Sequence, residues 1–188
     1  ADAVYMGLGS YNARRGAANF SEEDFAKAVR YCHIRGCKVY LTLNTLVGDR
    51  ELADAAGLAR MASDYGADGI IIQDLGLIEV VRKAVPDIPL HASTQMSVHN
   101  LAGVEACAEM GLTRAVLARE LSYEQIAYIT KHSPIEIEVF VHGALCFCHS
   151  GQCYMSSLIG RRSGNRGMCA QPCRMQYSMG GRMDDYPL

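Results

Sequence analysis

The chain has 188 residues, of which 49 % are hydrophobic and 20 % charged, so it can bury a sizeable core as one domain. It contains no apolar run near the roughly 20 residues that a membrane-spanning helix needs. It has eight cysteines, but it is too long and too regular to resemble a small secreted domain held by disulfides. We therefore expect a cytoplasmic protein without a membrane span.

Short apolar runs alternate with amphipathic stretches along most of the chain. Ser21 is the predicted N-cap of the first helix, because three acidic residues follow it and favour the positive end of the helix dipole. Asn100 caps a later helix, and Ser122 with Gln125 forms a capping box. The predicted strands cover residues 3–6, 38–43, 69–72, 90–93, 114–118 and 135–141, and the predicted helices cover 22–35, 50–65, 77–85, 101–110 and 123–132.

Six strands that alternate with helices predict a parallel sheet, either an open doubly wound sheet or a (β/α)₈ barrel. No GxGxxG or P-loop follows a strand, which weakens the nucleotide-binding alternative. We favour a partial TIM-like barrel of about six βα units. We expect residues 1–188 to form a single catalytic domain truncated at both ends, with a cysteine-rich segment at 138–174 within it.

Nearly every predicted strand ends in polar side chains, which would meet at one mouth of a barrel, where such enzymes place their chemistry. Along the last strand, alternation places Glu138 and His142 on one face and apolar residues on the other. Taken singly, such polar residues more often cap helices or satisfy the core. Because they converge, we take five as candidate catalytic residues: Asn44, Gln95, Arg119, Glu138 and His142.

Four cysteines are candidates for one metal site: Cys146, Cys153, Cys169 and Cys173, with the spacing C-x6-C-x15-C-x3-C. Four thiolates can hold an iron–sulfur cluster or a tetrahedral zinc ion. The wide first interval favours a cluster, but the spacing leaves zinc and free thiols open. Cys148 is a spare cysteine, which leaves the assignment of Cys146 open.

Nucleophilic catalysis is a further alternative for this segment. Cys146 and Cys148 lie close in sequence to His142 and His149, and a Cys–His pair can activate a thiolate. Closeness in sequence, however, does not establish the geometry of a catalytic pair.

Charge is distributed unevenly along the chain. Residues 1–138 contain 13 Lys and Arg against 18 Asp and Glu, whereas residues 139–188 contain five Arg against two Asp. The planar fork of Arg suits carboxylates and phosphates, so the basic segment predicts an anionic substrate, with a solvated basic loop as the alternative. The candidate substrate-binding residues are Arg161, Arg162, Arg166 and Arg174.

Two stretches carry a family resemblance. EVFVHGALC at 138–146, continued by GQCYMS at 151–156, resembles the signature of the collagenase-like peptidase family U32, and NRGMCAQPCR at 165–174 is similar to its second block. The resemblance implies a TIM-barrel-like catalytic domain within a longer bacterial protein. The family was named for proteolysis, and it includes oxygen-independent hydroxylation proteins that act on transfer RNA, ribosomal RNA or ubiquinone precursors. The resemblance also implies a [4Fe–4S] cluster on Cys146, Cys153, Cys169 and Cys173, and prephenate as the oxygen source.

Three functions are compatible with these features of the sequence. The first is an iron–sulfur-dependent hydroxylation enzyme that acts on RNA or a small aromatic molecule, and we favour it. The second is a collagenase-like endopeptidase, and the third is a non-catalytic barrel with a structural zinc site. Five arginines form a local patch rather than a basic domain, so a missing C-terminal domain is an alternative source of RNA binding.

Overall fold

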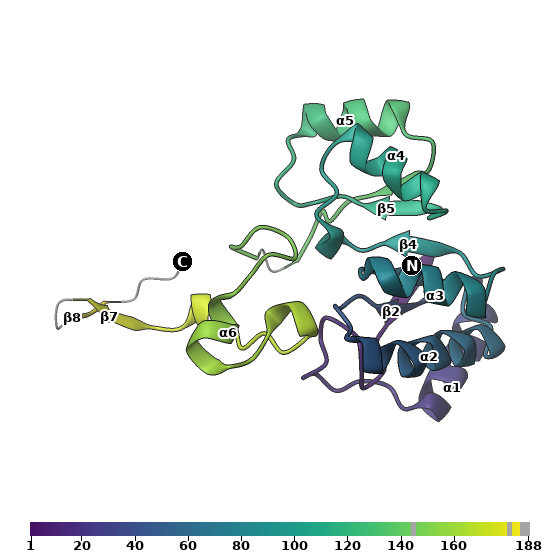
Figure 1. The fold of residues 1–188 in the computed structure, drawn as a ribbon, viewed down its shortest axis with the longest axis horizontal. Helices are drawn as coiled ribbons and strands as arrows, with labels where there is room; N and C mark the ends of the chain where they lie inside the picture. The colour runs from purple at the N-terminus through teal and green to yellow at the C-terminus, as the bar shows by residue number, and fades with distance from the viewer. Residues whose placement is uncertain (144–145, 180–181, 185–188) are drawn as a thin grey trace.

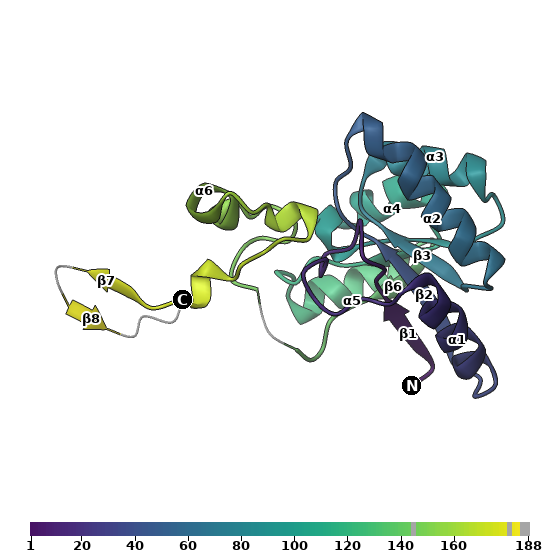
Figure 2. The ribbon, with the colours of Figure 1, turned by 90° about the horizontal axis from the view of Figure 1, so that it is seen from below.

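The computed structural model describes residues 1–143, 146–179 and 182–184. At its centre is a parallel sheet of six strands in the order β1-β2-β3-β4-β5-β6, which is also their order along the chain. Helices lie on the outer side of this curved sheet (Figures 1 and 2). This arrangement is half of a (β/α) barrel, as the alternation of strands and helices predicted.

The elements of the half-barrel are β1 (Ala3–Met6), α1 (Glu22–His33), β2 (Lys38–Leu43), α2 (Leu52–Asp64), β3 (Gly69–Ile72), α3 (Leu75–Ala84), β4 (Leu90–Ala92), α4 (Leu101–Glu109), β5 (Arg114–Val116), α5 (Tyr123–His132) and β6 (Glu136–Glu138). After it come α6 (Met155–Gly160) and a hairpin of β7 (Tyr177–Met179) and β8 (Arg182–Asp184). Short 3-10 helices in the described residues are η1 (Asp49–Glu51), η2 (Thr94–Met96), η3 (Gly164–Arg166) and η4 (Pro172–Arg174).

The helix starts follow local capping chemistry. At the predicted caps Ser21, Asn100 and Ser122, the side chain accepts a hydrogen bond from the backbone N–H three residues further on. α3 begins at Leu75 rather than at residue 77, because Asp74 accepts a hydrogen bond at its N-terminus. Asp74 is thus a helix cap, the more ordinary role for a polar residue at a strand end.

The last three strands are shorter than predicted, and β6 ends at Glu138 rather than at residue 141. The last ladder bond joins the Leu117 N–H to the Glu138 carbonyl oxygen at 2.9 Å. The chain of β5 then turns away, because the Ala118 N–H donates to the Val98 carbonyl oxygen. In the described part of the chain, residues 139–143 have no neighbouring strand, so the predicted alternation through His142 is wrong there.

The two faces of the sheet differ in chemistry because side chains alternate along each strand. Residues such as Leu41, Ile72 and Ala115 are fully buried against the helices. The inner face carries polar groups beside apolar ones. The polar groups centre on Arg114, whose Nε lies 2.9 Å from Glu136 Oε2 and whose Nη1 lies 3.2 Å from Glu138 Oε2.

Two aromatic rings extend this inner-face network. The Arg114 guanidinium carbon lies 5.3 Å from the centre of the Tyr40 ring, and the His91 ring meets Tyr40 edge-on at 4.7 Å. His91 is only 4 % exposed, and its Nδ1 has no hydrogen-bond partner among the described residues. Burial, reinforced by the positive charge of Arg114, lowers the pKa of His91 to about 4.

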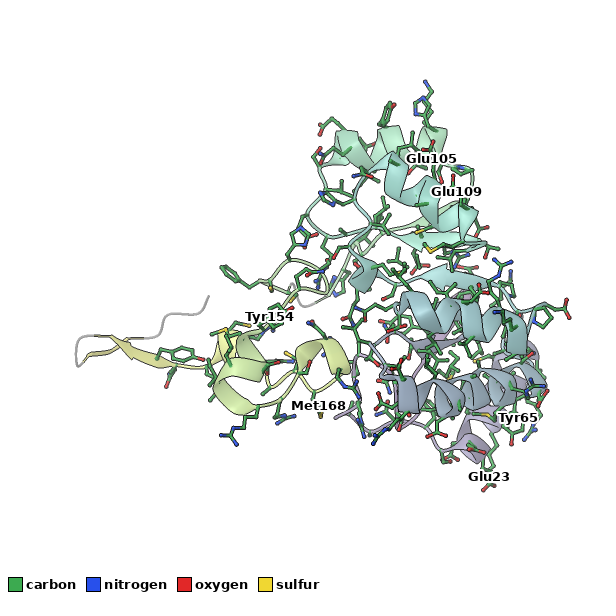
Figure 3. All side chains as sticks on the ribbon, viewed as in Figure 1. Glu23, Tyr65, Glu105, Glu109, Tyr154 and Met168 are labelled. Atoms are coloured by element: carbon green, nitrogen blue, oxygen red, sulfur yellow. The ribbon has the colours of Figure 1, made fainter. Side chains whose placement is uncertain are left out.

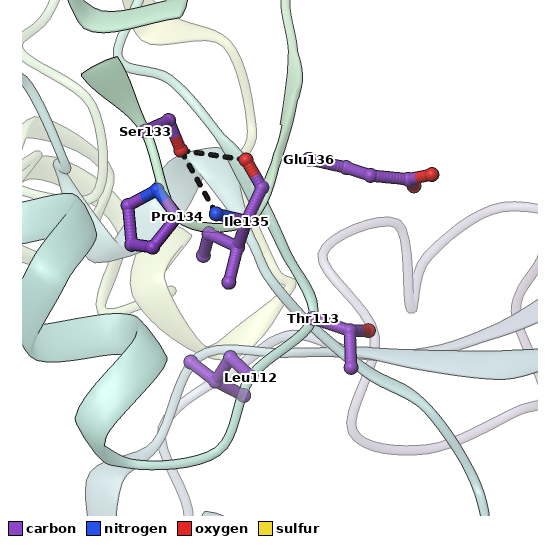
Figure 4. A pocket seen from close by; sticks show the side chains of 6 residues that line it. All are labelled: Leu112, Thr113, Ser133, Pro134, Ile135 and Glu136. Atoms are coloured by element: carbon purple, nitrogen blue, oxygen red, sulfur yellow. Dashed lines mark hydrogen bonds between the residues drawn. The ribbon is translucent and has the colours of Figure 1, made fainter.

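One cavity of about 470 Å³ lies at the amino ends of β5 and β6 (Figure 4). Ser133 Oγ closes a local turn there, donating to the Ile135 carbonyl oxygen at 2.6 Å and accepting from the Ile135 N–H at 3.1 Å. A second cavity of about 450 Å³ lies between the loop after β1 and α2. No helix in the described ranges is long and apolar enough to cross a membrane.

Replacement of His91 tests this inner face. Because the folded pKa of about 4 lies below the unfolded value of 6.5, the unfolded chain binds more protons as the pH falls between these values. We expect this difference at His91 to lower the free energy of unfolding of the wild type by about 2 kcal/mol between pH 7 and pH 5. In His91→Phe this part of the pH dependence should disappear, as measured by urea unfolding at both pH values. Equal losses in the two proteins would contradict the assignment.

Candidate functional site: a cysteine segment clamped across the strand ends

Residues 146–174, which we call the cysteine segment, lie at the carboxyl end of the half-barrel strands (Figures 1 and 2). Their contacts reach the loops that follow β1, β2, β4 and β5. The β7–β8 hairpin extends further from the sheet (Figure 2). The cysteine segment therefore covers the edge where barrel enzymes place their chemistry.

We call the hydrogen bonds that join Ser150 to Glu120, Arg119 and Ser97 the first clamp. The side chain of Ser150 is fully buried. Its N–H and its Oγ both donate to Glu120 Oε1, at 3.0 and 3.2 Å, while Arg119 Nε donates to Ser150 Oγ at 3.3 Å. Ser97 Oγ donates to the Ser150 carbonyl oxygen. Burial raises the pKa of Glu120, but the hydrogen bonds from Ser150 outweigh it, so the pKa is lowered and the carboxylate form is favoured.

The second clamp, which joins Arg166 to Glu51 and Asn165 to Leu46, connects the segment to η1 and to the loop after β2. Arg166 Nη2 lies 2.6 Å from Glu51 Oε1, and the Leu46 N–H donates to the Asn165 carbonyl oxygen at 3.3 Å. The hydrogen bond from Arg166 is the largest cause of a lowered pKa at Glu51. An Arg–carboxylate pair thus fixes the segment at a second point, 16 residues after Ser150.

At each clamp a glycine allows the backbone of the cysteine segment to lie in direct contact with the backbone of a half-barrel loop. A Cβ at Gly151 would lie less than 3.0 Å from the Gln95 carbonyl oxygen, and one at Gly167 would lie equally close to the Asn12 carbonyl oxygen. Both glycines also have positive φ, 69° and 75°. Figure 3 shows Met168, next to the second glycine, between α6 and the half-barrel. Only glycine fits either contact.

The two clamps share one pattern: a polar anchor, a glycine, any residue, then a cysteine. Ser150-Gly151 precedes Cys153, and Arg166-Gly167 precedes Cys169. Each clamp therefore fixes the backbone two residues before a candidate ligand. This repeated spacing was visible in the sequence, but its role depends on partners from distant parts of the chain.

Three of the thiols, those of Cys146, Cys148 and Cys153, lie close enough to interact. Burial raises the pKa of the Cys148 thiol, and the neighbouring thiols of Cys153 and Cys146 raise it further. A Cβ at Gly164 would lie 3.6 Å from Cys169 Cβ and 4.0 Å from the Cys153 carbonyl oxygen, so the second half of the segment folds back onto the first. Within the described residues, no three His, Cys, Asp or Glu side chains are gathered to hold a metal ion.

Three of the five candidate catalytic residues lie near the first clamp. Asn44 Oδ1 accepts from the Ala13 N–H at 2.9 Å, and Asn44 Nδ2 lies 3.5 Å from Ser93 Oγ. The Gln95 N–H donates to the same Ser93 Oγ at 3.2 Å, and the Gln95 carbonyl oxygen faces Gly151. Arg119 contacts Ser150 directly. Their shared position makes this edge the candidate site.

The other predicted site residues lie elsewhere. Glu138 binds Arg114 on the inner face, and His142 is exposed on the segment that follows β6. Among the candidate substrate-binding arginines, Arg161 and Arg162 are exposed, whereas Arg166 is engaged with Glu51. The clamp partners themselves were not among the candidate site residues: Glu51, Ser97, Glu120, Ser150 and the two glycines. Of these, only Glu120 is a polar residue at a predicted strand end.

Substitution of the clamp glycines should loosen the cysteine segment. Gly151→Ala and Gly167→Ala each force a Cβ into a carbonyl oxygen at positive φ, a strain of about 1–3 kcal/mol. We expect faster amide hydrogen exchange across residues 146–170 in both variants. Gly160→Ala is the matched control, because a Cβ there meets nothing within 4 Å. Exchange that is unchanged in all three variants would refute the glycine contacts.

Removal of either carboxylate, that of Glu120 or that of Glu51, should loosen only the clamp to which it belongs. Glu120→Ala removes the acceptor of the Ser150 N–H, so exchange at that amide should accelerate while the Leu46 amide stays protected. Glu51→Ala should produce the reverse result, because Leu46 reports the second clamp. Because both carboxyl pKa values are lowered, protection from each clamp should persist above pH 4.5 and be lost as the pH falls below it. Equal effects of both variants at both amides would show that the clamps are not separate.

Comparison with known proteins gives relatives of two kinds. Over 95 % of this chain, the sequence is 42 % identical to the 23S rRNA 5-hydroxycytidine synthase of Escherichia coli K12, and over 98 % it is 38 % identical to the tRNA hydroxylation protein P of the same organism. It is also 35 % identical, over 95 % of the chain, to a protein named collagenase from Porphyromonas gingivalis. The matched regions are 27 %, 41 % and 45 % of these relatives, so the chain spans less than half their length.

Solved structures support the fold. The U32 peptidase Mk0906 matches with a TM-score of 0.63 at 20 % identity, over 78 % of this chain and 62 % of that one. The copper homeostasis protein CutC from Streptococcus agalactiae matches with a TM-score of 0.56 at 17 % identity, over 82 % of this chain and 81 % of that one. The family model for Peptidase family U32 matches residues 1–186. The chain therefore belongs to Peptidase family U32.

Proposed function

We propose that this chain is the catalytic core of an oxygen-independent RNA hydroxylation enzyme that carries an iron–sulfur cluster. Two of its relatives are named for hydroxylation of ribosomal and transfer RNA. The observation that carries the proposal is the cysteine segment, which two clamps hold over the carboxyl ends of the strands. These clamps support the proposal because they hold the backbone near Cys153 and Cys169 at the carboxyl edge of the sheet.

The proposed cluster ligands are Cys146, Cys153, Cys169 and Cys173. The donor chemistry fits an iron–sulfur cluster, because thiolates are its usual ligands and no carboxylate lies between residues 138 and 184. Among the described residues, the thiols of Cys146 and Cys153 both interact with that of Cys148, but no three potential ligands are gathered around one point. Cys148, next to Cys153, competes with Cys146 for the remaining position. When bound, such a cluster supplies one-electron chemistry.

The chain's own residues supply positioning in this proposal. Asn44 and Gln95 hold the loops at the ends of β2 and β4 through the shared Ser93 hydroxyl, and Arg119 holds the Ser150 turn above them. The exposed Arg161 and Arg162 offer planar forks for an anionic substrate or for the carboxylates of prephenate, the proposed oxygen source. Action on RNA also places the protein in the cytoplasm.

Anaerobic purification tests the cofactor. We expect a brown protein that holds about four iron atoms and about four sulfide ions per chain. Cys169→Ala should lose both, whereas Cys37→Ala, at the far end of the half-barrel, should keep them. Elemental analysis and the visible spectrum measure the outcome. A colourless protein with one zinc ion would favour the structural-zinc alternative.

The reaction is tested separately. Nucleosides of transfer and ribosomal RNA from cells with and without the gene should differ by a hydroxylated pyrimidine, measured by mass spectrometry. The relative named collagenase keeps endopeptidase activity as the second candidate. Peptide cleavage that survives purification, is lost in Cys146→Ala and is accompanied by no change in RNA would replace the hydroxylation proposal.

A further inference from the structure

Two pairs of adjacent arginines, far apart in the sequence, belong to segments that the fold brings together, and Arg15 and Arg162 lie at the contact. Arg14 and Arg15 belong to the loop after β1, and Arg161 and Arg162 follow α6. The second clamp joins these parts, because Gly167 rests on the Asn12 carbonyl oxygen. We call Arg14, Arg15, Arg161 and Arg162 the arginine surface.

Two further contacts show how close the parts are. A Cβ at Gly167 would lie 3.1 Å from Arg15 Cβ, and a Cβ at Gly16 would lie 3.9 Å from Arg162 Nη2. The loop after β1 therefore lies against both ends of the 162–167 stretch. The two pairs of arginines are separated by well over a hundred residues in the sequence, and only the fold brings their segments together.

The arginine surface is positively charged and open to solvent. All four side chains belong to exposed residues, and none forms an ion pair within the described ranges. The nearby carboxylate of Glu51 is paired with Arg166, which therefore does not belong to this surface. Neither of the two cavities described above is lined by these arginines. An open array of guanidinium groups fits an extended polyanion better than a small enclosed anion.

The arginine surface is also connected to the cysteines. The buried Ser156 accepts from the Arg162 N–H through its carbonyl oxygen at 3.2 Å and from the Ala170 N–H through its Oγ at 2.8 Å. Ala170 follows Cys169 directly. A strand bound at Arg162 is thus held at a fixed position relative to one of the candidate cluster ligands.

We propose that Arg14, Arg15, Arg161 and Arg162 bind the phosphate backbone of the RNA substrate and guide it to the cysteine segment. This inference rests on the proposed function and adds the surface that holds the RNA. It assigns a binding role to the loop after β1, which the sequence analysis left without one. The contacts are to phosphates, so they supply affinity and register rather than sequence specificity.

Binding of fluorescein-labelled bulk transfer RNA, followed by anisotropy at several salt concentrations, tests the arginine surface. We expect Arg14→Ala/Arg15→Ala and Arg161→Ala/Arg162→Ala each to weaken binding roughly tenfold. The salt slope should fall by about 0.7–0.9 for each phosphate that is no longer neutralised. Arg30→Ala/Arg60→Ala removes the same charge from exposed positions on α1 and α2 and should change neither quantity. Unfolding midpoints of all variants check the fold.

The outcomes separate this inference from the proposed function. Equal weakening in all three double variants, or none, would overturn the arginine surface and leave the RNA reaction standing. Absence of transfer RNA binding by the unsubstituted protein would overturn both. Normal binding that depends on the four arginines, in a protein that yields no hydroxylated nucleoside, would support the surface and overturn the reaction.

Discussion

The site depends above all on the docking of the Ser150–Gly151 turn onto the carboxyl edge of the sheet. There a buried hydroxyl and its backbone N–H both bind the Glu120 carboxylate, and a glycine touches the Gln95 carbonyl oxygen. Ser150 is buried from solvent, so each of its polar groups needs a hydrogen-bond partner within the protein. Loss of any partner leaves a buried group unsatisfied, which makes the docked geometry specific.

The second clamp works by different chemistry and at a different place. Arg166 and Glu51 form a charged hydrogen bond beside a glycine that has no room for a side chain. Each clamp lies the same number of residues before a cysteine. Together the two clamps hold both halves of the cysteine segment over the half-barrel. The same docking brings the loop after β1 beside the arginines at 161–162, so the proposed ligand shell and the proposed RNA surface depend on one set of contacts.

The half-barrel has an apolar outer face and an inner face that carries a network of polar groups. Arg114 gathers Glu136, Glu138 and Tyr40 across neighbouring strands, with His91 buried beside them. Arg114 and Glu136 are the first residues of β5 and β6, and Tyr40 and His91 lie within β2 and β4, whereas Glu138 is the last residue of β6. Glu138, one of the predicted catalytic residues, belongs to this network, which gives it a partner on the inner face rather than at the clamped edge.

The sequence alone determined the alternation of strands and helices, the caps at Ser21, Asn100 and Ser122, and the family, because these depend on residues close together in the chain. It did not predict that β6 ends at Glu138, since a strand lasts only as long as its neighbour does. Only the tertiary structure decided which polar strand ends meet and what Ser150, Gly151 and Gly167 do. Their partners lie dozens to more than a hundred residues away, and no local pattern specifies a contact between backbones that far apart.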